Sequence, residues 1–107
     1  KSLNLKTKKI DKDNFSSYHL FVIYITSNKK NIRKELFEYF RKKKILVNVH
    51  YIPIHLQPYY KKLGFKTGQF KNSESYYKKA LSLPVHPLLK IRDIKKIINI
   101  IKKFLKN

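Results

Sequence analysis

The chain has 107 residues, 26 Lys and Arg against 6 Asp and Glu, a net charge of +20 and no cysteine. This length allows one domain at most, and the lack of cysteine excludes disulfides, zinc–thiolate sites and a thiol nucleophile. No run of 18 or more apolar residues occurs, which excludes an apolar transmembrane helix. Residues 1–13 are polar and contain no apolar signal core, so the sequence predicts a cytoplasmic protein.

The positive charge has two explanations. It is typical of nucleic-acid-binding modules, but lysine, isoleucine and asparagine also share AT-rich codons. Arginine, the preferred ligand for bases and phosphates, occurs only at Arg33, Arg41 and Arg92, and the lysines are spread along the chain. The pattern therefore favours a solvated basic surface, with a nucleic-acid-binding module as the alternative.

Residues 1–14 show little periodicity and are interpreted as a linker or leader from a missing large domain, in which Leu3, Leu5 and Ile10 form a short extended segment. Residues 18–26 are β-branched and aromatic and predict a strand. This run is apolar nearly throughout, so both of its faces should be covered, one of them by a partner domain.

The rest of the chain alternates between helical and extended patterns. One apolar stripe at Ile32, Leu36, Phe37 and Phe40 predicts a helix, and residues 45–49 predict a second strand. Asn72 or Ser73 is expected to cap a short helix that ends near residue 81, and residues 81–85 predict an edge strand because they contain Pro84. The clearest helix follows, with its apolar stripe at Ile91, Ile94, Ile97, Ile98, Ile101, Phe104 and Leu105.

These elements predict the fold class α+β over residues 15–107. We expect a two-layer small domain in which three short strands carry helices on one face, in the order β-α-β-α-β-α. No glycine-rich phosphate loop and no internal repeat is present.

The residues that can bind a ligand concentrate in the loop of residues 48–60. Pro53 and Pro58 cannot donate to a sheet, so the segment breaks away from the preceding strand. Loops on a rigid scaffold often carry binding chemistry. The loop combines hydrogen-bonding side chains without a lysine: Asn48, His50, Tyr51, His55, Gln57, Tyr59 and Tyr60.

The same residues give little support for autonomous catalysis. Pro53 separates His50 from His55, and no carboxylate occurs between Glu38 and Glu74, so no metal site is expected. The few carboxylates lie mostly among lysines and are interpreted as solvated ion pairs. Each of His19 and His86 is either a structural or a functional histidine. The chain by itself is thus interpreted as a binding or supporting domain.

Several pieces of the sequence resemble, in the same order, the C-terminal part of DegT-type nucleotide-sugar aminotransferases, which depend on pyridoxal phosphate (PLP). The resemblance covers the chain from about residue 15. The sequence of residues 48–60 is most similar to the branch that serves pseudaminic acid biosynthesis. The pieces are Ser17-Tyr18-His19-Leu20-Phe21, Arg33-Lys34-Glu35-Leu36, Asn48-Val49-His50-Tyr51-Ile52-Pro53-Ile54-His55-Leu56-Gln57-Pro58-Tyr59-Tyr60, Asn72-Ser73-Glu74, Ala80-Leu81-Ser82-Leu83-Pro84-Val85-His86-Pro87 and Asp93-Ile94.

The resemblance implies the C-terminal domain of an aminotransferase of fold type I. The parent enzyme would pass an amino group, from glutamate, to C4 of a UDP-4-keto-6-deoxy sugar for cell-surface glycans. A large domain of the same chain would carry the cofactor lysine, and the parent would be a homodimer. The fragment alone would be inactive and hold no cofactor.

Within this chain the resemblance implies substrate contacts from His50, Tyr51 and His55, and more weakly from Asn48. For Tyr59 and Tyr60, packing of the loop onto helices is an equal alternative. Two other functions stay open, namely a nucleic-acid-binding module and a free-standing domain that binds a sugar nucleotide. The sequence does not specify the exact sugar, the amino donor or the oligomeric state of the fragment.

Overall fold

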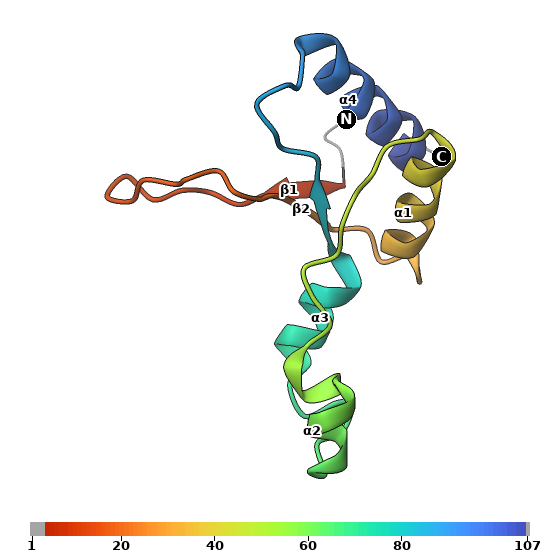
Figure 1. The fold of residues 1–107 in the computed structure, drawn as a ribbon. Coiled ribbons are helices and arrows are strands. Elements are labelled where there is room, and N and C mark those ends of the chain that lie inside the picture. Colours follow the sequence, from red (N-terminus) through yellow and green to blue (C-terminus); the bar gives the residue numbers. More distant parts are fainter. Residues whose placement is uncertain (1–3, 107) are drawn as a thin grey trace.

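The computed structural model describes residues 4–106, which form a three-stranded antiparallel sheet and its helices (Figure 1). The predicted fold class, α+β with three short strands, is confirmed. The elements are β1 (Leu5–Thr7), β2 (Phe21–Ile25), α1 (Ile32–Lys42), the 3-10 turn η1 (Ile54–Leu56), α2 (Pro58–Lys62), α3 (Lys71–Lys79), β3 (Ala80–Leu83) and α4 (Ile91–Lys106). Among these residues no helix has the length and hydropathy needed to cross a bilayer.

Strand β2 lies in the centre of the sheet, between β1 and β3. Directly paired residues of antiparallel strands point to the same face, and Ile23 pairs with Leu81 while Ile25 pairs with Leu5. This face is buried, since Ile23, Ile25 and Leu81 are at most 1% exposed. Burial of this face against the core therefore accounts for part of the apolar character of residues 18–26.

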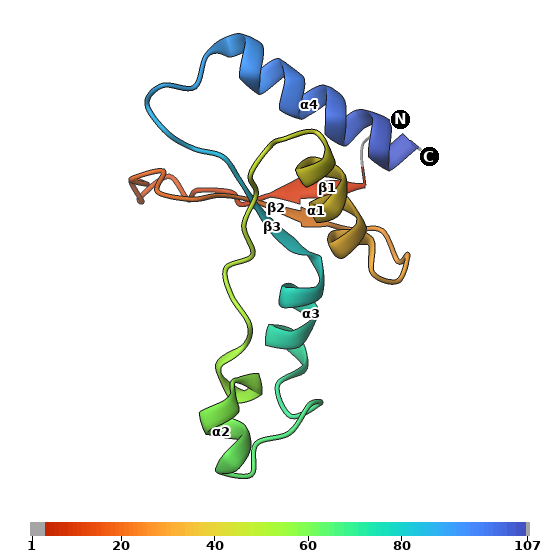
Figure 2. The same cartoon turned by 45° about the vertical axis from the view of Figure 1, so that its right-hand side comes forward.

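Helices α1 and α4 cover that face (Figure 2). Leu36 and Phe40 of α1 are completely buried, and α4 adds Ile97, Ile100 and Ile101. Full burial of a large apolar side chain contributes about 1.5–3 kcal/mol, so this cluster is the main source of stability. We call these buried apolar residues of β2, β3, α1 and α4 the core.

The opposite face of the sheet is only partly covered. Val22 and Tyr24 are half-buried, and the Tyr24 ring stacks against Tyr76 of α3 at a centroid distance of 6.2 Å. Cover of this face by a partner domain stays a prediction.

The predicted second strand, residues 45–49, is wrong. Only Asn48 forms a bridge, with Ser82, and Pro84 has no N–H with which to extend that ladder toward residue 46. Val47 is nonetheless buried, and Ile45 and Val49 pack against the core. The apolar run that indicated a strand thus reflects side-chain burial along an extended segment. The predicted order β-α-β-α-β-α is replaced by the observed order β1-β2-α1-η1-α2-α3-β3-α4.

The third strand is instead β1, from the segment interpreted as a leader. Leu5 packs on the core and pairs with Ile25, which explains why this short segment joins the sheet. Leu3 lies outside the described residues, and Ile10 lies outside the strand. A domain boundary at residue 14 stays a prediction.

Between Val47 and β3 the chain leaves the sheet and returns. We call residues 54–79, which contain η1, α2 and α3, the excursion, and Figure 2 shows it extending away from the sheet. Pro58 occupies the first turn of α2, where a missing N–H is harmless. Gly64, at φ 97°, ends that helix in a left-handed conformation that other residues rarely adopt. No side chain of residues 56–73 is buried.

Candidate functional site

The site is positioned by the bridge between Asn48 and Ser82 at the free edge of β3. The Asn48 N–H donates to the Ser82 carbonyl at 3.0 Å, and the Ser82 N–H donates to the Asn48 carbonyl at 2.8 Å. The backbone of Asn48 is thereby fixed while its side chain is exposed. The two residues that follow, His50 and Tyr51, start from a defined place on the sheet.

His50 and Tyr51 form one small surface. Nδ1 of His50 lies 2.7 Å from Oγ of Ser82, and the Tyr51 ring meets the imidazole edge-on with centroids 4.6 Å apart. His50 is half-buried and Tyr51 is 73% exposed. An imidazole and a phenol of this kind can exchange hydrogen bonds with sugar hydroxyls, and the ring of Tyr51 can pack on a sugar face. The structure thus brings together two of the predicted site residues, with Asn48 beside them.

His55 does not lie on this surface. It is 7% exposed, its Nε2 lies 2.9 Å from Oε1 of Glu74, and the Phe70 ring packs against it at 4.7 Å. The Gly68 N–H donates to the same Glu74 oxygen at 2.6 Å. This geometry favours a structural role for His55, whose contact with a substrate stays a prediction.

The two hydrogen bonds change the acidity of Glu74. The bond with His55, followed by the Gly68 N–H, holds the pKa of the Glu74 carboxyl below its ordinary value of 4.5, and desolvation only partly opposes them. The interpretation of the carboxylates as solvated ion pairs is therefore wrong for Glu74, which is 6% exposed. We call His55, Glu74 and the Gly68 N–H the latch.

Sequence reasoning missed both Glu74 and Ser82 as partners of the predicted histidines. His55 and Glu74 are 19 residues apart and meet only because the excursion turns back on itself. The available signal was that both partners stand in the pieces that carry the family resemblance, Asn72-Ser73-Glu74 and Leu81-Ser82-Leu83-Pro84.

Of Tyr59 and Tyr60, for which packing was the alternative to substrate contact, only Tyr60 is packed. Their rings meet edge-on at 5.3 Å, and Tyr60 also contacts Phe65 at 6.2 Å. Tyr60 is half-buried, whereas Tyr59 is 66% exposed. Tyr60 therefore packs the excursion together, while Tyr59 faces outward.

The described residues do not fit a cofactor or metal site of their own. PLP requires a lysine for the Schiff base and a partner for its ring nitrogen, yet no lysine of residues 4–106 is buried. Glu74, a buried carboxylate, is already bonded to His55 and Gly68. Over the same residues, no group of three or more His, Cys, Asp or Glu side chains is arranged to hold a metal.

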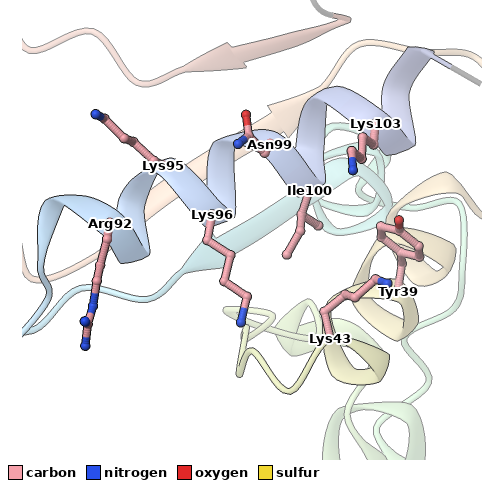
Figure 3. A pocket seen from close by; sticks show the side chains of 8 residues that line it. All are labelled: Tyr39, Lys43, Arg92, Lys95, Lys96, Asn99, Ile100 and Lys103. Atoms are coloured by element: carbon pink, nitrogen blue, oxygen red, sulfur yellow. The ribbon is translucent and has the colours of Figure 1, made fainter.

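A hollow lies between α1 and α4 (Figure 3). Its lining is strongly basic and contains no carboxylate. The residues are Tyr39, Lys43, Arg92, Lys95, Lys96, Asn99, Ile100 and Lys103. We call this surface the basic groove, and it belongs to different elements from those that carry His50 and Tyr51.

Comparisons with known proteins show the family and the fold of this chain. Residues 1–102 match the DegT/DnrJ/EryC1/StrS aminotransferase family. The UDP-4-amino-4,6-dideoxy-N-acetyl-beta-L-altrosamine transaminase of Helicobacter pylori is 33% identical over 88 residues, which are 82% of this chain and 23% of that protein. The chain spans about a quarter of the length of the curated relatives it matches.

Solved structures share the fold. Helicobacter pylori PseC, an aminotransferase involved in the biosynthesis of pseudoaminic acid, superposes with a TM-score of 0.76 at 32% identity, covering 85% of this chain and 24% of that one. A Streptococcus pneumoniae protein described as a sugar aminotransferase, in its PLP form, gives a TM-score of 0.88 at 24% identity over 96% of this chain and 26% of its own. The match over residues 1–102 establishes that this chain belongs to the DegT/DnrJ/EryC1/StrS aminotransferase family.

Proposed function

We propose that this chain is the C-terminal small domain of a PLP-dependent sugar aminotransferase, with residues 15–107 as the domain and residues 1–14, which add β1 to its sheet, as its connection to a large domain. The whole protein transfers an amino group from glutamate to C4 of a UDP-4-keto-6-deoxy sugar. We place it in the cytoplasm, as a homodimer. The match of residues 1–102 to the aminotransferase family carries this proposal.

The names given to a relative from Helicobacter pylori, in sequence and in structure, support the finer substrate assignment. The Helicobacter pylori transaminase acts, by its name, on a UDP-4-amino-4,6-dideoxy sugar, and PseC serves pseudoaminic acid biosynthesis. By this analogy the product enters a cell-surface polysaccharide through the pseudaminic acid pathway. The lysines of this chain are not assigned to the cofactor, because the resemblance implies that the large domain carries that lysine.

In this proposal the chain forms one wall of the substrate cleft. His50 and Tyr51 bind and orient the sugar nucleotide, with Asn48 at the margin, and the latch holds the excursion beside them. Their hydrogen-bonding groups and the exposed Tyr51 ring suit a sugar ligand. PLP, when bound by the upstream domain, supplies the chemistry that carries the amino group.

The test is absorbance spectroscopy on the protein extended upstream to its natural start. A near-visible cofactor band should shift when glutamate is added and return when a UDP-4-keto-6-deoxy sugar follows. A folded full-length protein without a cofactor band, or a natural start just before Lys1, would contradict the proposal. A UDP-sugar that binds such a free-standing chain would support the third function left open by the sequence.

The basic groove favours a second candidate function, binding of nucleic acid without sequence preference. Five cations, Lys43, Arg92, Lys95, Lys96 and Lys103, line it without a carboxylate. If the groove binds single strands, log K should fall with log salt by roughly 0.7 per phosphate contacted. The double variant Lys95→Glu/Lys96→Glu should then weaken binding, while Lys6→Glu/Lys8→Glu on and beside β1 serves as the charge-matched control.

A further inference from the structure

Among the described residues, the Ser82 hydroxyl has a single hydrogen-bond partner. Oγ of Ser82 lies 2.7 Å from Nδ1 of His50, and this is the only hydrogen bond that the Ser82 hydroxyl makes among residues 4–106. Ser82 is 4% exposed, so water does not readily replace that partner. Its backbone is fixed by two hydrogen bonds with Asn48, which sets the position of the hydroxyl.

This arrangement distinguishes the two neutral forms of His50. If Nδ1 carried the proton and donated to Oγ, the buried hydroxyl hydrogen would have no acceptor. If the hydroxyl donates to an unprotonated Nδ1, every buried hydrogen is satisfied. A buried donor without a partner is costly, so the second arrangement is favoured. The proton of neutral His50 then sits on Nε2.

We propose that Ser82 is a positioning residue, which fixes the ring of His50 with Nδ1 as acceptor and Nε2–H as donor toward the ligand. This deepens the proposed function and rests on it for the identity of the ligand. Within the described residues Nε2 of His50 makes no hydrogen bond, so its N–H is available. The site thereby prefers an acceptor oxygen of the sugar nucleotide, such as its 4-keto oxygen.

The assignment of the proton is tested by nuclear magnetic resonance without cofactor or substrate. In the ¹⁵N-labelled 107-residue chain, at a pH where histidine is neutral, long-range ¹H–¹⁵N correlations report which ring nitrogen carries hydrogen. His50 is assigned by the signals lost in His50→Gln. We expect an unprotonated, hydrogen-bonded Nδ1 and a protonated Nε2. A protonated Nδ1 in the unmodified chain would overturn the proposal.

Ser82→Ala should move the Nδ1 resonance and admit the second tautomer, because it removes the only hydrogen-bond partner that residues 4–106 offer to Nδ1. Ser82→Thr keeps the hydroxyl and should retain the original pattern. Ser75→Ala, on the exposed surface of α3, is the matched control and should change neither ring nitrogen. Ring-nitrogen shifts that are identical in Ser82→Ala and the unmodified chain would sink the idea.

The functional part is tested on the full-length protein. Ser82→Ala should raise KM for the keto-sugar about fivefold with a smaller change in kcat, the effect of one misplaced hydrogen bond, and Ser82→Thr should restore it. Active protein with an unchanged KM in Ser82→Ala would refute a positioning role. Complete absence of aminotransferase activity in the unmodified protein would instead refute the proposed function, while the spectra of the short chain would still decide the tautomer.

Discussion

The core and the excursion are held together by different forces. The core buries Leu36, Phe40 and Leu81 completely, whereas the excursion buries no side chain between residues 56 and 73. The excursion is held by the latch, by the stacking of Tyr76 of α3 on Tyr24 of the sheet, and by a chain of ring contacts within it. These contacts are Tyr59–Tyr60, Tyr60–Phe65, Phe65–Phe70 and His55–Phe70.

This difference in burial indicates that the core is rigid and that the excursion can open locally. Apolar burial gives the core its cooperative stability, while a region with few buried contacts opens locally at lower cost. His50 stands on the rigid side, since Ser82 of β3 holds it. His55 belongs to the excursion, although both histidines come from one loop. The site therefore combines a fixed donor with a neighbouring segment of lower stability.

The largest expected effect is on the core. Phe40→Ala removes a fully buried ring and should lower the free energy of unfolding by about 3–5 kcal/mol, measured by urea denaturation. Phe15→Ala, at a position that is 97% exposed, is the matched control and should stay within about 0.5 kcal/mol. Equal losses in both variants would show that the core does not dominate stability.

The next largest effect is on kcat/KM for the substrate, with little change in the free energy of unfolding. His50→Ala in the full-length protein should reduce kcat/KM for the keto-sugar by about tenfold or more, the loss of a hydrogen bond and a packing surface at the substrate. Unfolding by urea should change much less than in Phe40→Ala, because His50 is half-buried. Unchanged kcat/KM would remove His50 from the site.

The latch should determine the local stability of the excursion without affecting that of the core. In His55→Ala, amide hydrogen exchange of residues 54–74 should accelerate about tenfold, because Glu74 loses its buried partner, while exchange in β2 should stay constant. His86→Ala, which changes an exposed histidine, is the control. Faster exchange in β2 as well would show that core and excursion form one cooperative unit.

The smallest effect is the response to pH. The lowered pKa of Glu74 means that its ionised form stabilises the fold above the ordinary value near 4.5, and that this contribution is lost as pH falls through the lower folded value. Protection of the excursion, which is its exchange rate relative to the intrinsic amide rate at the same pH, should therefore fall with acid below about pH 4.5. Glu74→Gln should flatten this dependence, whereas Glu35→Gln, at a partly exposed site, should leave it in place.

Much of the core was predictable because apolar periodicity records burial directly. The stripe at Ile32, Leu36 and Phe40 predicted α1, and the final stripe predicted α4 almost to its ends. The apolar pattern was misleading at residues 45–49, where burial persists without a ladder. For β1, which has three residues, it indicated a short extended segment at Leu5 but not a strand of the sheet. Strands this short depend on a neighbour that the pattern of one segment does not contain.

The sequence alone predicted that the loop with His50 and Tyr51 carries the site, and it also revealed the family resemblance. Local chemistry suffices for this, because prolines break a strand and hydrogen-bonding side chains cluster after it. Only the tertiary structure decided that His50 pairs with Ser82 and that His55 is buried on Glu74. Those partners are 32 and 19 residues apart, and contacts over such separations are set by how the whole chain folds.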